Sequence, residues 1–315
     1  MSISVFIDGQ AGTTGLQVAE KLANHGAVEL VTLTGDLRKD AHARRDAFAA
    51  ADAAILCLPD EAAKQAAALA DGLDVVLIDA STQHRTDDAW VYGMAELGSA
   101  QRQKIAQSKH ISNPGCYPTG FLAMTVPLRD AGVLGADAHL VVPAISGYTG
   151  GGKGLIEAFD AGTAPRHFSY AHSLSHKHLP EMQKMASLSS RPIFMPSVGD
   201  FAQGMLVHLP LFERQLEKQV TAGDIVEILQ AHYQDSQLIS AYDSDDMSHH
   251  NENGFLPADG LKGTDRVEIF TSYNKDSQQF WLTARLDNLG KGASGAAVQN
   301  MNIALGLDET LGLSL

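Results

Sequence analysis

Cysteine is scarce in this sequence, with two residues among 315. Two thiols cannot form a disulfide scaffold, and Cys57 and Cys116 do not have the spacing of a metal-binding motif. Basic side chains are also outnumbered, 23 against 37 acidic ones, which gives a formal net charge of −14 at pH 7. A surface of this sign repels phosphate backbones and acidic membranes, so we expect no nucleic-acid partner.

Long apolar runs are lacking as well. Nowhere do roughly 18 apolar residues follow one another without charge, the length that a membrane-spanning helix needs. The first residues, MSISVFIDGQ, lack the basic lead, apolar core and cleavage site of a secretory signal. We therefore expect a cytoplasmic protein in a reducing compartment, with no membrane partner.

What the first third of the chain does contain is an alternation of strand-like and helix-like segments. Residues 3–8 (ISVFID) predict a strand, three glycines follow, and LQVAEKLANHG has helical spacing. A helix is predicted to begin just after Pro59. Further strands are predicted in segments 27–34, 53–58 and 73–81. This order predicts an α/β fold with a Rossmann-like, doubly wound parallel sheet.

The pattern changes after about residue 115. Longer alternating strands such as RVEIFTSYN and QFWLTARLD predict an α+β domain with an antiparallel sheet. We place a dinucleotide-binding domain at residues 1–115, to which residues 294–315 return as a C-terminal helix. A catalytic and dimerisation domain is expected at residues 116–293.

Glycines follow the first strand at the spacing G-x-x-G-x-x-G, formed by Gly9, Gly12 and Gly15. Glycines at the start of a helix let the backbone approach a pyrophosphate, and the helix N-terminus favours its charge. An ordinary tight turn is the alternative, but a strand before and a helix after favour a dinucleotide site. Thr13 and Thr14 are expected to contact the cofactor there.

The end of the second strand bears on the choice of dinucleotide. Thr34 stands where an NAD site usually has an acid, and Arg38 with Lys39 can meet a 2′-phosphate. This favours NADP, with Thr34 and Arg38 as contacts. Asp36 keeps NAD open, and the basic pair can equally be a solvated helix start.

Cys116 lies in the segment SNPGCYPTG, between a Pro-Gly turn and a predicted helix. At a helix N-terminus the dipole favours thiolate over thiol, as a nucleophile requires. Cys57 lies in the buried-strand pattern AAILCLP and is expected to be structural.

Three histidines, His172, His176 and His178, occur in YAHSLSHKHLPE, and one of them is expected to act as the base for the thiol. A zinc site is the alternative, but the chain has no H-E-x-x-H or C-x-x-C spacing. We predict no metal site, and we expect SHHNEN (248–253) to be an exposed loop.

Several segments together resemble one family: the glycine loop, NPGCYPTG, SGYTGGGKG (146–154), HKHLPE and KGASGAAVQNMN (291–302). Their order and spacing cover essentially the whole chain, which is similar to the shorter form of the N-acetyl-gamma-glutamyl-phosphate reductases. Lys177 is a departure, because it replaces an arginine often found between the two histidines and cannot make a bidentate contact.

The resemblance implies NADPH-dependent reduction of N-acetyl-glutamyl 5-phosphate to the 5-semialdehyde and phosphate, a step of arginine biosynthesis. Cys116 would form a thioester, and His176 would assist as general acid–base. Relatives such as aspartate-semialdehyde dehydrogenase share the chemistry and the two-domain plan. Such relatives commonly assemble through the sheet of the second domain, so a homo-oligomer, dimer or tetramer, is expected.

Further site residues are expected from the residues and the resemblance together. Arg85 follows a strand end and is assigned to phosphate; Asn113 is a donor to the carbonyl oxygen. Asn300 is expected to contact the nicotinamide. The residues expected to hold the substrate are Tyr170, His178 and Lys153.

Three alternatives stay open. The same chemistry can act on aspartyl or N-acetyl-aminoadipyl phosphate, which substrate comparison separates. A Cys–His thiol hydrolase or acyltransferase would use Cys116 and His176 without a nicotinamide. A catalytically silent NADP-binding sensor would need neither side chain.

Overall fold

The computed structural model describes residues 2–243 and 245–315. The chain forms two compact units. The first contains the residues up to Gly115 together with Ala293–Ser314, and the second contains Cys116–Gly292. No helix in the described part of the chain is long and apolar enough to cross a bilayer.

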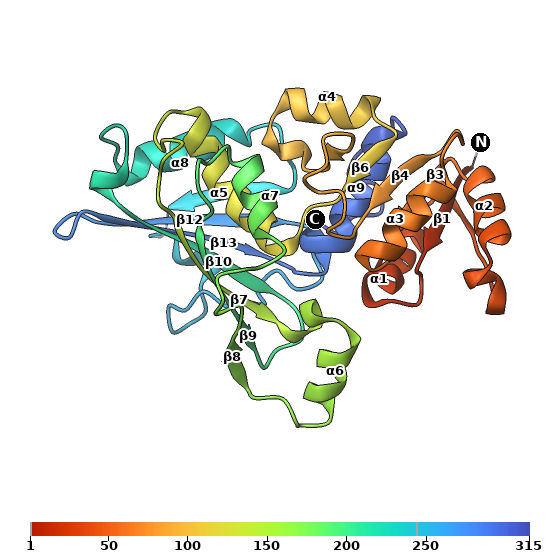
Figure 1. Ribbon diagram of the computed structural model, residues 1–315. Helices are drawn as coiled ribbons and strands as arrows, with labels where there is room; N and C mark the ends of the chain where they lie inside the picture. Colours follow the sequence, from red (N-terminus) through yellow and green to blue (C-terminus); the bar gives the residue numbers. More distant parts are fainter. Residues whose placement is uncertain (1, 244) are drawn as a thin grey trace. The chain divides into compact units, whose positions relative to one another are not determined.

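The first unit is built on a parallel six-stranded sheet in the order β2-β1-β3-β4-β6-β5 (Figure 1). The strands are β1 (Ile3–Asp8), β2 (Val28–Val31), β3 (Ala53–Leu56), β4 (Val76–Asp79), β5 (Val91–Tyr92) and β6 (His110–Ser112). Every recorded pairing is parallel, so the carboxyl ends of these strands lie at one edge. The predicted Rossmann-like sheet is confirmed.

Helices cover both faces of this sheet, as a doubly wound fold requires. They are α1 (Thr13–Ala23), α2 (Ala41–Ala49), α3 (Asp60–Leu69), α4 (Ser99–Gln107) and α9 (Gly295–Ala304), with the 3₁₀ segments η1 (Gly35–Lys39) and η2 (Ala95–Leu97). α2 begins where the Asp40 side chain accepts a hydrogen bond from the Ala43 amide, and α3 begins after Pro59, as predicted.

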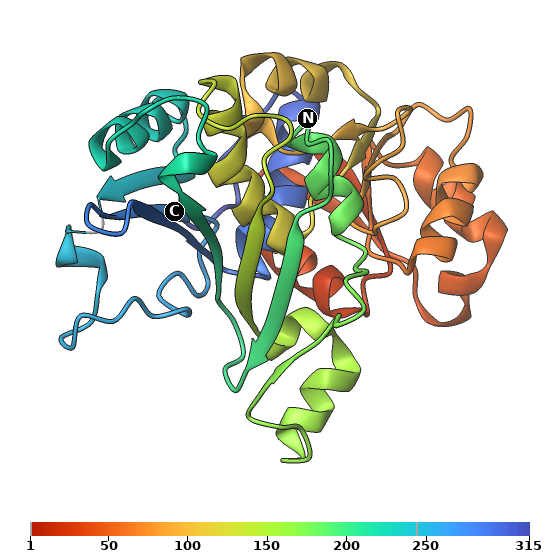
Figure 2. The ribbon, with the colours of Figure 1, turned by 60° about the vertical axis from the view of Figure 1, so that its left-hand side comes forward.

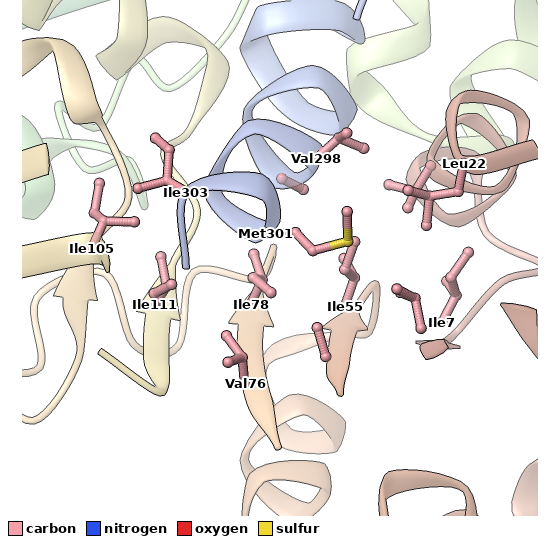
Figure 3. Packing of buried hydrophobic residues seen from close by; sticks show 14 of the residues in the cluster. Ile7, Leu22, Ile55, Val76, Ile78, Ile105, Ile111, Val298, Met301 and Ile303 are labelled. Carbon is pink, nitrogen blue, oxygen red and sulfur yellow. The ribbon is translucent and has the colours of Figure 1, made fainter. Parts of the chain in front are cut away.

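Two apolar cores hold these layers together. On one face, Val298 and Met301 of α9 pack with Leu22 of α1 over the strand residues Ile55 and Ile78 (Figure 3). On the other face, side chains of α2 and α3 form the second core with alternate strand residues. Because α9 contributes four buried residues, Ala297, Val298, Met301 and Ile303, to the first core, this late segment is an integral layer of the first unit.

The second unit contains a seven-stranded sheet in the order β11-β12-β13-β10-β7-β9-β8. The strands are β7 (Val141–Gly147), β8 (His167–Ser169), β9 (Ile193–Gly199), β10 (Met205–Phe212), β11 (Ile239–Asp243), β12 (Val267–Asn274) and β13 (Gln279–Leu286). The expectation of an antiparallel sheet is wrong for two pairs, since β7–β9 and β11–β12 are parallel. Long connections between these strands permit the parallel crossover.

One face of this sheet is covered by helices. The helical segments of the unit are α5 (Cys116–Asp130), α6 (Lys153–Asp160), α7 (Leu179–Met185), α8 (Ala222–His232), the 3₁₀ turns η3 (Tyr148–Gly151), η4 (Glu213–Gln215) and η5 (Met247–His249), and the π-helical turn η6 (Gly290–Ser294), which continues into the first unit. α5 packs on β10 and β13, where a methyl group on Gly120 would lie 2.9 Å from Val207. α6, in yellow-green, projects beyond the carboxyl end of β7 (Figure 2).

The opposite face of the sheet carries exposed apolar side chains. Trp281 and Met195 are each 54% exposed, and Ile193 and Phe212 are 49% and 40% exposed. They belong to β13, β9 and β10. We call these four residues the outer sheet face.

Candidate active site and cofactor site

The glycine loop joins β1 to α1, and glycine suits each of its three positions for a different physical reason. Gly9 has φ +91° and comes so close to the Cys57 carbonyl that a methyl group has no room. A Cβ on Gly15 would lie 2.7 Å from the Gln10 Cα, so only glycine lets α1 pack on the loop. At Gly12 the nearest atom would be 3.5 Å away, an ordinary contact. The lack of a side chain at Gly12 therefore leaves space above the loop.

The start of α1 fits a dinucleotide pyrophosphate. Gly12 is the N-cap residue and has no side chain to satisfy the first helical amides, and the first turn, with Thr13 and Thr14, has no acidic residue. Unsatisfied amides and the positive end of the helix dipole bind anions. The loop therefore has the shape and charge of a phosphate-binding loop.

Beyond β2, Thr34 is the exposed N-cap residue of η1. The Nε of Arg38 donates to the Leu33 carbonyl at 2.9 Å, which anchors this exposed side chain beside the strand end. The residues predicted to distinguish NADP from NAD thus lie at the carboxyl edge of the sheet, where cofactors bind in this fold.

Asp8 and Arg44 form an ion pair at this edge that sequence reasoning missed. Oδ2 of Asp8, the last residue of β1, accepts from Nε and Nη2 of Arg44 at 3.1 and 2.6 Å. Burial raises the pKa of Asp8, and the hydrogen bonds and charge of Arg44 oppose that rise. The signal in the sequence was an acid immediately before the glycines and a run of basic residues after β2.

Arg85 and Asn113 belong to a buried hydrogen-bond network in the first unit. Nε of Arg85 donates to the Asn113 carbonyl at 2.9 Å, and its Nη2 donates to the Ala80 carbonyl at 3.3 Å. The Asn113 amide nitrogen donates to the Ala293 carbonyl at 2.9 Å. These bonds fix the backbone three residues before Cys116.

Asn300 of α9 completes the network. Its Nδ2 donates to the Gly93 carbonyl at 2.8 Å and to Oδ1 of Asn113 at 3.1 Å. Its Oδ1 is buried and has no hydrogen-bond partner among the residues that the structure describes. A buried acceptor of this kind favours a ligand donor, and a carboxamide of the cofactor is such a donor.

A second polar cluster follows β4. Asp79 is fully buried, and its carboxylate accepts from the backbone and hydroxyl of Ser81 and lies 2.6 Å from Nδ1 of His84. The His84 ring stacks on Trp90 at 4.1 Å. These contacts hold the turn that carries Arg85 and were not anticipated from the sequence.

In the second unit, Cys116 is the first residue of α5 and is partly exposed. Gly292 of η6 packs directly on it, since a Cβ on Gly292 would lie 2.8 Å from the Cys116 Cβ. A π-helical turn is rare and often marks a functional site. Cys116 therefore lies at the start of a helix, as its segment predicted.

Two tyrosines lie near Cys116, and the charge of Cys116 contributes to their pKa values. Desolvation raises the pKa of Tyr170 to about 12, and the charge of Cys116 adds to this rise. Burial also raises the pKa of Tyr117 far above its usual value, again with a contribution from Cys116. The Tyr170 hydroxyl donates to that of Tyr117 at 3.4 Å, and Tyr117 donates to the Ser197 carbonyl at 3.2 Å. Both tyrosines are therefore protonated donors at neutral pH.

His176 and His178 pack with aromatic rings of the second unit. The centroids of the two imidazole rings lie 4.7 Å apart, and the His176 ring centroid lies 5.7 Å from that of Tyr170 and 5.1 Å from that of Phe194. The backbone N–H of His178 donates to Nδ1 of His176 at 3.2 Å. A ring that accepts at Nδ1 carries its proton on Nε2 when neutral.

The loop before these histidines is strained. Ala171 and Leu174 have φ values of +58° and +55°, which L-residues rarely adopt. Strain of this kind clusters at functional sites. His172 lies in this loop as an exposed residue whose Nε2 is 2.8 Å from the Ser169 hydroxyl.

The remaining predictions are placed elsewhere. Lys153 starts α6, is 85% exposed and lies 3.8 Å from Glu157. Cys57 follows β3, and burial together with the charges of Asp79 and Asp8 raises its pKa to about 12. No group of three or more potential ligands capable of holding a metal was found within residues 2–243 and 245–315.

Two family models match the chain. The semialdehyde dehydrogenase NAD-binding domain matches residues 4–107, and the semialdehyde dehydrogenase dimerisation domain matches residues 116–288. Similar curated proteins include the N-acetyl-gamma-glutamyl-phosphate reductases of Trichormus variabilis and Brucella canis, both 45% identical to this chain. These alignments cover 98% of this chain and 98% of the first relative, and 97% and 100% for the second.

Solved structures with the same fold include two aspartate semialdehyde dehydrogenases. Enzyme II of Vibrio cholerae, complexed with ASA, has a TM-score of 0.72 at 14% identity, over 97% of this chain and 99% of that one. The Candida albicans enzyme, solved with NADP, has a TM-score of 0.65 at 12% identity, over 96% and 98%. At these identities the likeness establishes the fold.

Proposed function

The chain belongs to the N-acetyl-gamma-glutamyl-phosphate reductases of the semialdehyde dehydrogenase family, and on that basis we propose how its residues carry out the reaction. It reduces N-acetyl-L-glutamyl 5-phosphate with NADPH to N-acetyl-L-glutamate 5-semialdehyde and phosphate, a step of arginine biosynthesis. The placement of Cys116 as the first residue of α5 is the observation that carries the mechanism.

Cys116 is the nucleophile. The positive end of α5 stabilises a negative sulfur, which attacks the acyl carbon of the substrate. The carbon–oxygen bond to phosphate then breaks, phosphate leaves with the electron pair, and a thioester remains on Cys116. When the thioester has been reduced to a thiohemiacetal, the carbon–sulfur bond breaks, the aldehyde departs and the thiolate is regenerated.

His176 stabilises the carbonyl oxygen as it becomes negative. Because Nδ1 accepts from the His178 amide, the neutral ring offers Nε2–H as a donor. A neutral imidazole of this kind acts as an electrophile rather than as a base for the thiol. This refines the general acid–base role expected from the sequence.

Tyr170, His178 and Tyr117 orient the substrate around the sulfur. Both tyrosine hydroxyls stay protonated at neutral pH, so they add no negative charge beside the sulfur. The hydrogen bond from Tyr170 to Tyr117 holds the two rings together. Lys153 is a more distant contact for the substrate carboxylate, and Arg85 supports the phosphate while holding the Asn113 backbone.

The cofactor site is assigned to the first unit. Gly9, Gly12, Gly15, Thr13 and Thr14 hold the pyrophosphate, and Thr34 with Arg38 contact the adenosine end. The buried Oδ1 of Asn300 accepts from the carboxamide. NADPH, when bound, supplies the hydride for the thioester.

The protein works as a homo-oligomer, a dimer or tetramer, in the cytoplasm. Apolar patches as exposed as the outer sheet face are typical of subunit interfaces. The matched description of the second unit as a dimerisation domain supports the same use.

The reverse reaction tests this function. Purified protein with NADP⁺, phosphate and N-acetyl-glutamate semialdehyde is expected to produce the absorbance of reduced nicotinamide, and kcat/KM is expected to be lower with aspartate semialdehyde. A folded protein that gives no signal refutes the proposal. Acyl transfer by Cys116 without any nicotinamide would instead identify a thiol acyltransferase.

A further inference from the structure

The Asp8–Arg44 ion pair lies immediately before the phosphate-binding loop. Asp8 is 5% exposed and precedes Gly9 in the chain. A buried carboxylate at this place is unfavourable for a cofactor with several phosphate charges, because like charges repel strongly where water is excluded. The pair therefore has a larger consequence for cofactor binding than an ordinary surface ion pair.

Arg44 differs from the other basic residues that follow β2. Arg38 and Lys39 are exposed on η1, and Arg45 is exposed on α2 with its guanidinium directed to the carbonyls of Leu69 and Asp71. The Arg44 side chain is 14% exposed and points to the end of β1. It is held in one orientation by two hydrogen bonds to a single oxygen.

The position of Arg44 matches the adenosine end of the cofactor. β1 and β2 are parallel neighbours, with Phe6 opposite Val31, so their carboxyl ends lie side by side. In this fold the adenosine ribose lies near the end of β2, and an arginine there accommodates the 2′-phosphate of NADP. Arg44 starts from the helix after β2 and reaches the end of β1, so its guanidinium lies at this edge.

One nitrogen of the Arg44 guanidinium, Nη1, is not used in the ion pair with Asp8. Nε and Nη2 of Arg44 are used by Asp8, whereas none of the residues that the structure describes accepts from Nη1. Because Asp8 fixes the guanidinium plane, Nη1 is oriented before any ligand arrives. An arginine positioned in advance loses less freedom on binding an anion.

We propose that Arg44, positioned by Asp8, is a specificity-determining residue that binds the adenosine 2′-phosphate of NADPH. This inference rests on the NADPH-dependent function proposed above. It adds the residue that binds the 2′-phosphate, the group that NADPH has and NADH lacks. Asp8 is a positioning residue, because its two hydrogen bonds with Arg44 orient the guanidinium. NADH has a neutral hydroxyl at the same place, so it gains no ion pair with Arg44.

Calorimetric titration of the full chain with NADP⁺ and NAD⁺ tests the proposal. In the double variant Asp8→Asn/Arg44→Gln, both charges are removed; asparagine keeps the size of the aspartate, and glutamine is shorter than the arginine that it replaces. We expect the Kd for NADP⁺ to rise about 10- to 100-fold, the effect of losing a charge-assisted hydrogen bond, and the Kd for NAD⁺ to change by less than about threefold. Adenosine 2′,5′-bisphosphate is expected to lose the same factor as NADP⁺.

Arg45→Gln is the matched control, since it removes the same charge from the neighbouring position of α2. It is expected to leave both Kd values unchanged. If Arg44 only neutralises Asp8, the double variant binds NADP⁺ as tightly as the unmodified protein, and the proposal is wrong. An equal loss for NADP⁺ and NAD⁺ also overturns it, because that result indicates a general disturbance of the glycine loop.

Arg44→Lys is a second test of the proposal, to be used if the double variant does not fold. It keeps a cation beside Asp8 but loses the planar fork. A decrease of about threefold or more in the NADP⁺/NAD⁺ affinity ratio supports the proposal, and an unchanged ratio contradicts it. These titrations need no acyl phosphate, so their outcome is independent of whether the proposed reduction is observed.

Discussion

At the scale of single residues, Gly292 limits what the surroundings of Cys116 can tolerate. A methyl group there would lie 2.8 Å from the Cys116 Cβ and 3.0 Å from the Asp287 carbonyl, and the latter is backbone that cannot turn aside. We predict that Gly292→Ala displaces Cys116 and lowers kcat about 10²-fold, the cost of a misplacement near 1 Å. Steady-state kinetics of the purified variant measure this.

Gly154→Ala is the control for that substitution. Nothing lies within 4 Å of the position of its Cβ, and Gly154 is in helix α6, where alanine is favoured. It is expected to keep kcat and to raise the unfolding temperature slightly. If Gly292→Ala retains full kcat, the close packing on Cys116 has no catalytic importance.

The two cysteines are predicted to differ in reactivity. Cys116 is partly exposed at a helix start, whereas the pKa of Cys57 is raised to about 12, so Cys57 stays a thiol at neutral pH. Iodoacetamide at pH 8 is expected to label Cys116 and leave Cys57 unlabelled in the folded chain. Peptide mapping by mass spectrometry distinguishes the two, and labelling of Cys57 at the rate of a free thiol would contradict the assignment.

How far single residues were predictable depends on whether their signal is local. Cys116 and His176 stand out because a turn, a helix start and clustered histidines are contiguous in the sequence. Gly292 and the Asp8–Arg44 pair depend on contacts between distant segments, which no spacing rule reveals. Arg85 is intermediate: its strand-end position was visible, but its bond to the Asn113 carbonyl was not.

At the scale of elements, strand β10 carries a histidine that makes the second sheet sensitive to acid. Desolvation lowers the pKa of His208 from 6.5 to about 4. Its Nδ1 accepts from the Trp281 indole at 3.1 Å and lies 3.0 Å from the Thr283 hydroxyl. Between these two pKa values the unfolded chain binds the proton and the folded chain does not, so stability falls as pH decreases.

We expect the unfolding free energy to decrease by up to about 3 kcal/mol as pH falls from about 6.5 to about 4, from this group alone. Urea unfolding at several pH values measures it. In His208→Gln the contribution of this group is removed, so the profile should be flatter by that amount. An unchanged profile would show that His208 does not titrate with folding.

The predictability of elements follows the same rule. β1, α1 and the start of α3 are set by apolar runs, glycines and Pro59, all local, and they occur where predicted. The parallel pairing of β7 with β9 could not be predicted, because the two strands are far apart in the chain and the alternation within a strand does not specify its neighbour.

At the scale of the whole molecule, we propose that the outer sheet face joins the subunits. Trp281 and Met195 are each 54% exposed there, which is costly for a monomer in water. We predict that the unmodified chain sediments as a dimer or larger, and that Met195→Lys/Trp281→Lys sediments as a monomer because charges would be buried at the interface.

Leu311→Lys serves as the comparison, since this apolar residue is also exposed, at 38%, but belongs to the first unit. It is expected to leave the sedimentation coefficient unchanged. A double variant that still sediments with the unmodified protein would mean that another surface joins the subunits.

The contribution of α9 to the core of the first unit has a consequence for biosynthesis. Because α9 follows the entire second unit along the chain, the ribosome delivers Val298 and Met301 only after Cys116–Gly292 has been made. The chain of the second unit is therefore complete before the last helix of the first unit has been made. A nascent chain stalled before α9 should expose an unsealed apolar surface and recruit chaperones.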